Sequence, residues 1–86
     1  PTPDAIFVGG GISIPGLLET CWHALKMGGR LVANTVTLEA EREMLHFAHK
    51  FGARLTRIAI SREENVGTMT ALKPMAPVLQ LSALKE

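Results

Sequence analysis

The chain has 86 residues, of which 47% are hydrophobic, and a formal net charge of +1 at pH 7. This length is enough for one small domain with a marginal core. The balanced charge and the low aromatic content (5%) argue against a nucleic-acid partner. No apolar run approaches the roughly 20 residues that span a bilayer, so no membrane partner is expected. The single cysteine, Cys21, cannot form an internal disulfide, which is typical of a cytoplasmic globular protein.

The first expected element is a strand over residues 5–8, a continuous apolar run that ends at Gly9-Gly10-Gly11. Such a run is typical of a strand buried on both faces of a parallel sheet. Residues 15–27 then repeat apolar side chains at three- and four-residue spacing, which predicts a helix. Ser13 is placed to cap its start, and Gly28-Gly29 supply a left-handed stop.

Residues 30–37 predict a second strand with a polar end. Thr37 is placed to cap a second helix, whose apolar positions continue to Gly52. Glu39 and Glu41 lie in the first turn of this helix, where acidic side chains interact favourably with the helix dipole.

Residues 54–62 predict a third strand, and residues 78–84 a last one. Residues 63–77 show no clean period and contain Gly67 and prolines, which predicts a long loop. Because no helix separates the third and last strands, they should pair antiparallel. Right-handed crossovers should place the first three strands side by side in parallel. The predicted fold class is α/β, the C-terminal half of a doubly wound sheet with a C-terminal antiparallel pair.

The first strand would lie at an open edge of this sheet, covered by only two helices. Exposed apolar edge strands promote aggregation. We therefore expect residues 1–86 to form a partial domain, whose upstream half lies outside this chain. The alternative is that the chain dimerises through this edge and forms a homo-oligomer.

Gly9-Gly10-Gly11 follow the first strand, at the edge of a parallel sheet where ligands collect. Glycines there let a ligand approach the backbone closely, although they could equally make only a tight turn. The segment does not fit the dinucleotide-binding pattern, because Ile14 stands where the third glycine would be. It does not fit the phosphate-binding P-loop either, because Leu17 follows Gly16 where a lysine is required.

Asn34 and Thr35 end the second strand and are expected to face the same crevice as the glycines. The Asn34 amide could hold a carboxylate or a carbonyl group, whereas Thr37 is better explained as a helix cap. Further along, Arg62 and Lys73 are candidate contacts for an acidic substrate, with ordinary surface charge as the alternative for Lys73.

Glu43, His46 and His49 lie on one side of the second predicted helix, at a spacing that could hold a metal. The apolar stripe of this helix passes through other positions, so these side chains are expected on the solvated face. No metal site is therefore predicted.

Several short segments, in this order along the chain, resemble the C-terminal part of the precorrin-6Y C5,15-methyltransferase (decarboxylating) family. The similarity covers nearly the whole chain. These segments are residues 3–11, residues 28–39, Ile60-Ser61-Arg62, Gly67-Thr68-Met69 and Pro77-Val78. The resemblance implies a class I methyltransferase domain that uses S-adenosylmethionine to methylate C15 of a precorrin tetrapyrrole in cobalamin biosynthesis. The same reaction releases carbon dioxide from the C12 acetate.

The resemblance also implies site residues. Gly9, Gly10 and Gly11 would lie beside the cofactor, and Asn34 would be the catalytic residue near the transfer site. Arg62 and Gly67-Thr68-Met69 would contact the tetrapyrrole. The family's main glycine-rich cofactor loop and acidic cofactor contact would lie upstream of Pro1, and no general base is evident.

Two alternatives remain at the level of the sequence. One is a non-catalytic α/β module for subunit contacts, and the other is a dinucleotide-binding, dehydrogenase-like domain.

Overall fold

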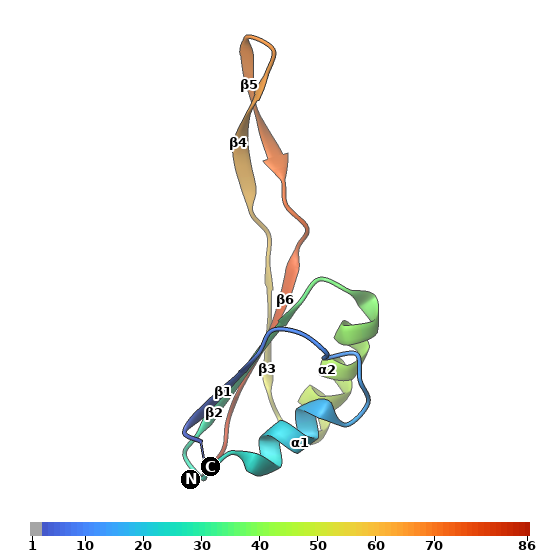
Figure 1. The fold of residues 1–86 in the computed structure, drawn as a ribbon, viewed down its shortest axis with the longest axis vertical. Helices are drawn as coiled ribbons and strands as arrows, with labels where there is room; N and C mark the ends of the chain where they lie inside the picture. Colours follow the sequence, from blue (N-terminus) through green and yellow to red (C-terminus); the bar gives the residue numbers. More distant parts are fainter. Residues whose placement is uncertain (1–2) are drawn as a thin grey trace.

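The computed structural model describes residues 3–86, which form a four-stranded sheet, two helices and a separate two-stranded ribbon (Figure 1). The order of the large sheet is β1-β2-β6-β3. Strand β1 runs parallel to β2, whereas β6 runs antiparallel to both β2 and β3. The elements in chain order are β1 (Ala5–Val8), α1 (Leu17–Ala24), β2 (Arg30–Thr35), α2 (Leu38–Phe51), β3 (Arg54–Ile58), β4 (Ser61–Val66), β5 (Met69–Pro74) and β6 (Val78–Leu84).

Strand β6 lies between β2 and β3. In the register of the sheet, Leu81 is opposite Ala33 on one side and Leu55 on the other. The predicted antiparallel pairing of the third and last strands is therefore confirmed. The expectation that β2 and β3 are neighbours is wrong, because β6 occupies the position between them. Leu81 is fully buried, as expected for an apolar strand in the interior of the sheet.

The hydrophobic core lies on the face of the sheet that both helices cover (Figure 1). Alternate residues of β2 and β6, such as Leu31 and Leu81, point to this face and pack with Met44 and Phe47 of α2. The indole of Trp22 in α1 meets the ring of Phe47 edge-on, with ring centroids 5.6 Å apart. The buried apolar set is Val8, Ile12, Leu18, Leu25, Leu31, Ala33, Ala40, Met44, Phe47, Leu79, Leu81 and Ala83.

The opposite face of the sheet has no helix over it within residues 3–86. Phe7, whose side chain points to this face next to Val32, is 64% exposed, whereas the adjacent Val8 is buried. The prediction that the first strand is buried on both faces is therefore wrong for this chain. The physical reason is that only one layer of helices is present, so only every second side chain of β1 finds a cover.

Helix α2 begins and ends as predicted. The Thr37 hydroxyl accepts a hydrogen bond from the Ala40 backbone N–H at 3.2 Å, and Gly52 ends the helix in the left-handed conformation. Helix α1 differs, because it starts at Leu17 after Gly16 (φ 83°) and has no side-chain cap. The proposed Ser13 cap is wrong, since residues 11–16 form turns instead of the first turn of a helix.

Residues 63–77 do not form the predicted loop. Most of them belong to a ribbon of β4 and β5, joined by Gly67 and Thr68, and Gly67 has the positive φ (64°) that a tight hairpin turn requires. The third strand ends at Ile58, earlier than predicted, and β4 begins at Ser61. Every residue of β4 and β5 is exposed. The ribbon therefore has no buried face, and its sequence carries no alternation of apolar and polar residues that would have revealed it.

Within residues 3–86, neither helix is long and apolar enough to cross a membrane.

Candidate functional site

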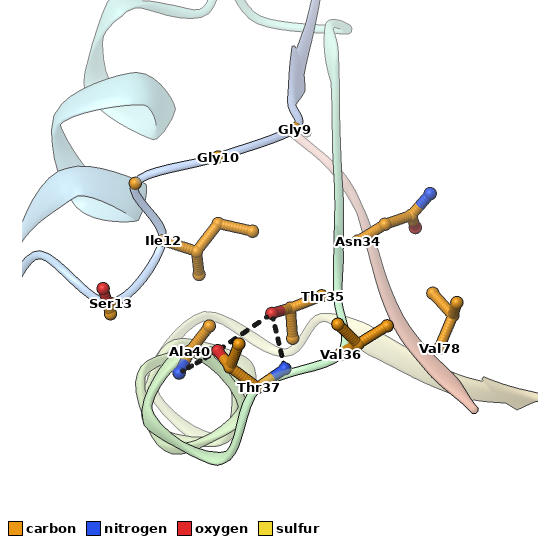
Figure 2. Close-up of a pocket in the computed structure, with 11 residues that line it drawn as sticks. Gly9, Gly10, Ile12, Ser13, Asn34, Thr35, Val36, Thr37, Ala40 and Val78 are labelled. Atoms are coloured by element: carbon orange, nitrogen blue, oxygen red, sulfur yellow. Dashed lines mark hydrogen bonds between the residues drawn. The ribbon is translucent and has the colours of Figure 1, made fainter. Parts of the chain in front are cut away.

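A cavity of about 460 Å³ opens at the carboxyl ends of β1 and β2 (Figure 2). The loop after β1 contributes Gly9-Gly10-Gly11, and the end of β2 contributes Asn34. The parallel pairing of β1 with β2 explains this meeting, because it brings the two carboxyl ends to one edge of the sheet. Two groups of residues that the sequence singled out separately thus line the same space. The full lining is Gly9, Gly10, Gly11, Ile12, Ser13, Asn34, Thr35, Val36, Thr37, Ala40 and Val78.

The glycines differ in what they do for this cavity. Gly11 has φ 73°, and its carbonyl accepts a hydrogen bond from the Ile14 N–H, so it is required by the turn. A Cβ atom added at Gly10 would meet nothing within 4 Å. Gly11 therefore makes the turn, whereas Gly10 leaves room for a ligand to approach the backbone.

Asn34 carries a polar atom without a partner. Its Oδ1 atom is buried and accepts no hydrogen bond from any described residue. Figure 2 shows the amide on the opposite side of β2 from the Thr35 side chain, which agrees with the alternation of side chains along a strand. A buried polar atom without a hydrogen bond costs about 1–3 kcal/mol. An uncompensated group of this kind is a candidate contact for a ligand.

The two threonines of this loop are already engaged with each other and with the backbone. Thr37 N–H donates to the Thr35 hydroxyl at 3.2 Å, and the two hydroxyl oxygens lie 3.3 Å apart. The Thr37 hydroxyl also accepts from the Ala40 N–H. Thr37 is therefore a helix cap, as its position in the sequence favoured, and it fixes the loop that follows Asn34.

A second cavity, of about 310 Å³, lies at the base of the ribbon and has Val36 and Val78 in common with the first. Its only charged lining residue is Arg62, which forms no ion pair with the part of the chain that the structure describes. The remaining walls are apolar: Val36, Ile58, Ile60, Met75, Ala76 and Val78. The Met75 N–H donates to the Ile60 carbonyl at 2.8 Å, which holds the two sides of this cavity together.

The ribbon separates the other expected substrate contacts from Arg62. Gly67, Thr68 and Met69 lie at its tip, and they line neither cavity. Sequence reasoning missed the apolar walls around Arg62. Ile60 and Met75 are about half exposed, so they belong to no buried stripe, and they become neighbours only through the ribbon.

Neither cavity is lined by a carboxylate, a histidine or a cysteine among residues 3–86. The same residues contain no group of three or more His, Cys, Asp or Glu side chains that could hold a metal ion. His46 and His49 are exposed on α2, as the helical pattern predicted. The chemistry that these cavities support is thus binding and positioning by backbone, amide and guanidinium groups.

Comparison with known proteins agrees with this arrangement. Residues 1–85 match the family described as precorrin methyltransferase domain. The chain is 49% identical over 85 residues to a precorrin-6Y C(5,15)-methyltransferase (decarboxylating) from Sinorhizobium sp, covering 99% of this chain and 21% of that protein.

Solved structures show the same fold. The C-terminal domain of precorrin-6Y C5,15-methyltransferase from Rhodobacter capsulatus superposes with a TM-score of 0.86 at 38% identity, over 99% of this chain and 46% of that one. A SAM-dependent O-methyltransferase from Thermotoga maritima shares the fold at 20% identity, with a TM-score of 0.60 over 98% of this chain and 34% of that one.

The chain thus has the α/β fold of the C-terminal half of a class I methyltransferase domain. It spans about one fifth of the length of the curated relative and about half of the solved domain. Its match along residues 1–85 shows that the chain belongs to the precorrin methyltransferase family.

Proposed function

We propose that the full-length protein is an S-adenosylmethionine-dependent methyltransferase that methylates C15 of a precorrin and removes the carboxyl group of the C12 acetate, in cobalamin biosynthesis. The observation that carries this proposal is the cavity in which Gly9-Gly10-Gly11 meet Asn34, in a chain that matches the family from end to end. The alternatives, a non-catalytic module or a dinucleotide-binding dehydrogenase, do not account for this match.

The residues present fit one end of S-adenosylmethionine. Space is open beside the Gly10 backbone, and the buried Asn34 oxygen lacks a hydrogen-bond donor. When bound, the cofactor supplies an electrophilic methyl group on a positively charged sulfur. The glycine segment would provide close backbone contact, and Asn34 would orient the reacting groups, which is the main requirement of a methyl transfer.

The cavity around Arg62 has a lining that suits one edge of the precorrin. A precorrin presents a large apolar ring system edged with carboxylates, and this cavity has apolar walls with a single guanidinium that forms no ion pair among residues 3–86. Arg62 would anchor a carboxylate by paired hydrogen bonds while Ile60 and Met75 contact the ring. This cavity and the one at Asn34 share Val36 and Val78 in their linings, which would place ring and cofactor near each other.

Decarboxylation of the C12 acetate breaks a carbon–carbon bond, and the electron pair left behind can be delocalised into the macrocycle before a proton replaces the lost group. Neither cavity presents an acid or base from residues 3–86. The role of this chain in that step would therefore be to hold the substrate.

We also propose that residues 1–86 form the C-terminal half of one methyltransferase domain in the cytoplasm, and that the preceding half supplies the remaining cofactor contacts. The uncovered sheet face around Phe7 supports this arrangement, as does the length of the solved domain, of which this chain covers 46%. A doubly wound sheet needs helices on both faces.

Calorimetric titration of the full-length protein with S-adenosylmethionine tests the proposal. A saturable binding heat is expected, and its absence at saturating cofactor would overturn the assignment. Asn34→Ala is expected to lower the methylation rate at least tenfold, while Asn65→Ala, which changes an exposed asparagine of the ribbon, should keep the wild-type rate.

Arg62 is tested in the same assay through substrate affinity. Arg62→Ala is expected to raise KM for the precorrin with little change in cofactor affinity. The matched control is Arg42→Ala, at an exposed position of α2 that lines neither cavity. Equal effects of the two substitutions would remove Arg62 from the site.

A further inference from the structure

Two valines, Val36 and Val78, belong to the linings of both cavities. Thr35 pairs with Leu79 in the sheet. Val36 and Val78, which follow and precede this pair, are therefore neighbours across the ends of β2 and β6. Figure 2 shows Val36 between Thr35 and Val78. Val36 is 56% exposed, whereas Val78 is half-buried, so Val36 is the more accessible part of the border between the cavities.

The cavities on the two sides of this border differ in chemistry. The first is lined mainly by glycines and polar residues, among them Gly9-Gly10-Gly11 and Asn34. The second is apolar apart from Arg62. A polar, charged cofactor suits the first cavity and an apolar ring suits the second. The atoms that react with each other are therefore expected to meet at the border, beside Val36.

Hydrogen bonds hold the backbone on both sides of Val36. The Thr37 N–H donates to the Thr35 hydroxyl at 3.2 Å, a bond that spans position 36. The Thr37 hydroxyl in turn accepts from the Ala40 N–H of α2. A single exposed valine is ordinary on a protein surface. Val36 differs because its position is fixed by its neighbours, which leaves the side chain free to contact a ligand.

We propose that Val36 is a specificity-determining residue that contacts both the methyl group of S-adenosylmethionine and the precorrin ring, and so sets which ring carbon meets the methyl group. This inference rests on the proposed function. A β-branched side chain is restricted at χ1, so it presents a surface of defined position. Methyl transfer depends mainly on the alignment of ring carbon, methyl carbon and sulfur.

The reaction explains why one contact at this border can control the product. The ring carbon supplies the electron pair of the new carbon–carbon bond, and the pair of the broken carbon–sulfur bond stays on sulfur, which becomes a neutral thioether. The positive charge passes to the ring, which loses it as a proton to solvent. Because no residue lining either cavity within 3–86 acts as an acid or base, the choice of carbon depends on how the ring is placed.

Binding to the full-length protein, measured by calorimetry, tests the contact with the methyl group. S-adenosylhomocysteine lacks only the methyl group that is transferred, so it is the matched probe. Val36→Phe should weaken S-adenosylmethionine binding about tenfold, as overpacking of a contact does, and should affect S-adenosylhomocysteine much less. Leu45→Phe, at an exposed apolar position of α2 that lines neither cavity, should leave both affinities unchanged. Equal effects of Val36→Phe on the two probes would overturn the proposal.

The position of the new methyl group tests the contact with the ring. Val36→Ala removes most of the border side chain, so a share of the product should carry the methyl group at ring carbons other than C15. Transfer from S-adenosylmethionine with a ¹³C-labelled methyl group, followed by NMR of the product, measures this share. The wild-type protein and Leu45→Ala should methylate C15 alone. Methylation only at C15 by Val36→Ala would overturn the proposal.

The two assays separate this inference from the function on which it rests. A wild-type protein that does not bind S-adenosylmethionine would overturn both. A wild-type protein that binds it and methylates C15, with Val36 variants that behave like the Leu45 variants, would overturn only the role of Val36. Melting curves that match the wild type would show that the substitutions leave the fold intact.

Discussion

The Lys85 ammonium lies 2.8 Å from the backbone carbonyl oxygen of Trp22, 63 positions earlier in the chain. It also donates to the Leu25 carbonyl at 2.7 Å and lies 5.8 Å from the centroid of the indole ring. These carbonyls are at the C-terminal end of α1, where the helix dipole is negative, and the Trp22 carbonyl also accepts the Leu25 N–H at 3.2 Å. One side chain thus ties the end of β6 to the end of α1.

Lys85→Met should destabilise the full-length protein by about 1–3 kcal/mol, because it removes charge-assisted hydrogen bonds to partly buried carbonyls and retains most of the apolar stem. Urea unfolding measures the loss. Lys26→Met is the control, since Lys26 pairs with Asp4 at the surface, where both side chains are more than half exposed, and its removal should cost less than about 1 kcal/mol. Equal losses in the two variants would contradict a special role for Lys85.

Position 29 requires glycine, because Leu25 and the Asp4 backbone lie too close to it for a side chain. A Cβ atom added there would lie 2.6 Å from Leu25 Cγ and 2.8 Å from the Asp4 carbonyl oxygen. That carbonyl also accepts the Arg30 N–H at 3.0 Å, so it is not free to move. Gly29→Ala should therefore cost about 1–3 kcal/mol of unfolding free energy.

Gly10→Ala is the companion substitution, because a Cβ atom at Gly10 meets nothing and its φ is not positive. We expect unchanged stability in thermal melts but weaker binding of S-adenosylmethionine in the calorimeter. Wild-type cofactor affinity in this variant would argue that the cofactor does not approach Gly10.

The Thr37 cap should contribute about 1 kcal/mol to stability. Thr37→Ala removes the acceptor for the Ala40 N–H, and Thr37→Ser should restore most of the loss. Ser13→Ala should have little effect on urea unfolding, because Ser13 caps no helix. A larger effect at Ser13 than at Thr37 would contradict the observed helix starts.

The Glu41–Arg57 ion pair predicts a pH dependence of stability. The guanidinium donates to both carboxylate oxygens, at 2.8 and 3.2 Å, and this hydrogen bonding lowers the pKa of Glu41 below its ordinary 4.5. The folded protein therefore binds this proton less readily than the unfolded chain. The contribution of the pair is present above the unfolded carboxyl pKa and is lost as pH falls through the lowered value in the folded protein.

Glu41→Gln should accordingly flatten the decline of unfolding free energy below about pH 4.5, measured by urea titration at successive pH values. Glu39→Gln, in the same turn of α2 but outside any ion pair of the described residues, is the control and should flatten that decline less than Glu41→Gln does. A wild-type acid profile for Glu41→Gln would contradict the assignment.

Local patterns in the sequence were enough to predict most of the large sheet and α2. The apolar run at residues 5–8 and the alternation at residues 78–84 mark β1 and β6, and the capping residues Thr37 and Gly52 mark the ends of α2. The meeting of Gly9-Gly10-Gly11 with Asn34 was also predictable. Consecutive parallel strands bring their carboxyl ends to one edge of the sheet. The residues that follow β1 and those that end β2 are therefore expected to lie close together.

Only the tertiary structure decided where β6 inserts, what covers Phe7, and which side chains surround Arg62. Strand order depends on contacts between residues far apart in the chain, and burial of Phe7 depends on what lies above the sheet. Ile60 and Met75 lie beside Arg62 because β4 and β5 form a hairpin, which brings the residues before β4 next to those after β5. The sequence by itself therefore determined the family, the main elements and the meeting of Gly9-Gly10-Gly11 with Asn34 at one cavity. The tertiary structure decided the apolar lining around Arg62 and the exposure of the β4–β5 ribbon. Neither feature produces a periodic pattern of apolar residues within a single segment of the sequence.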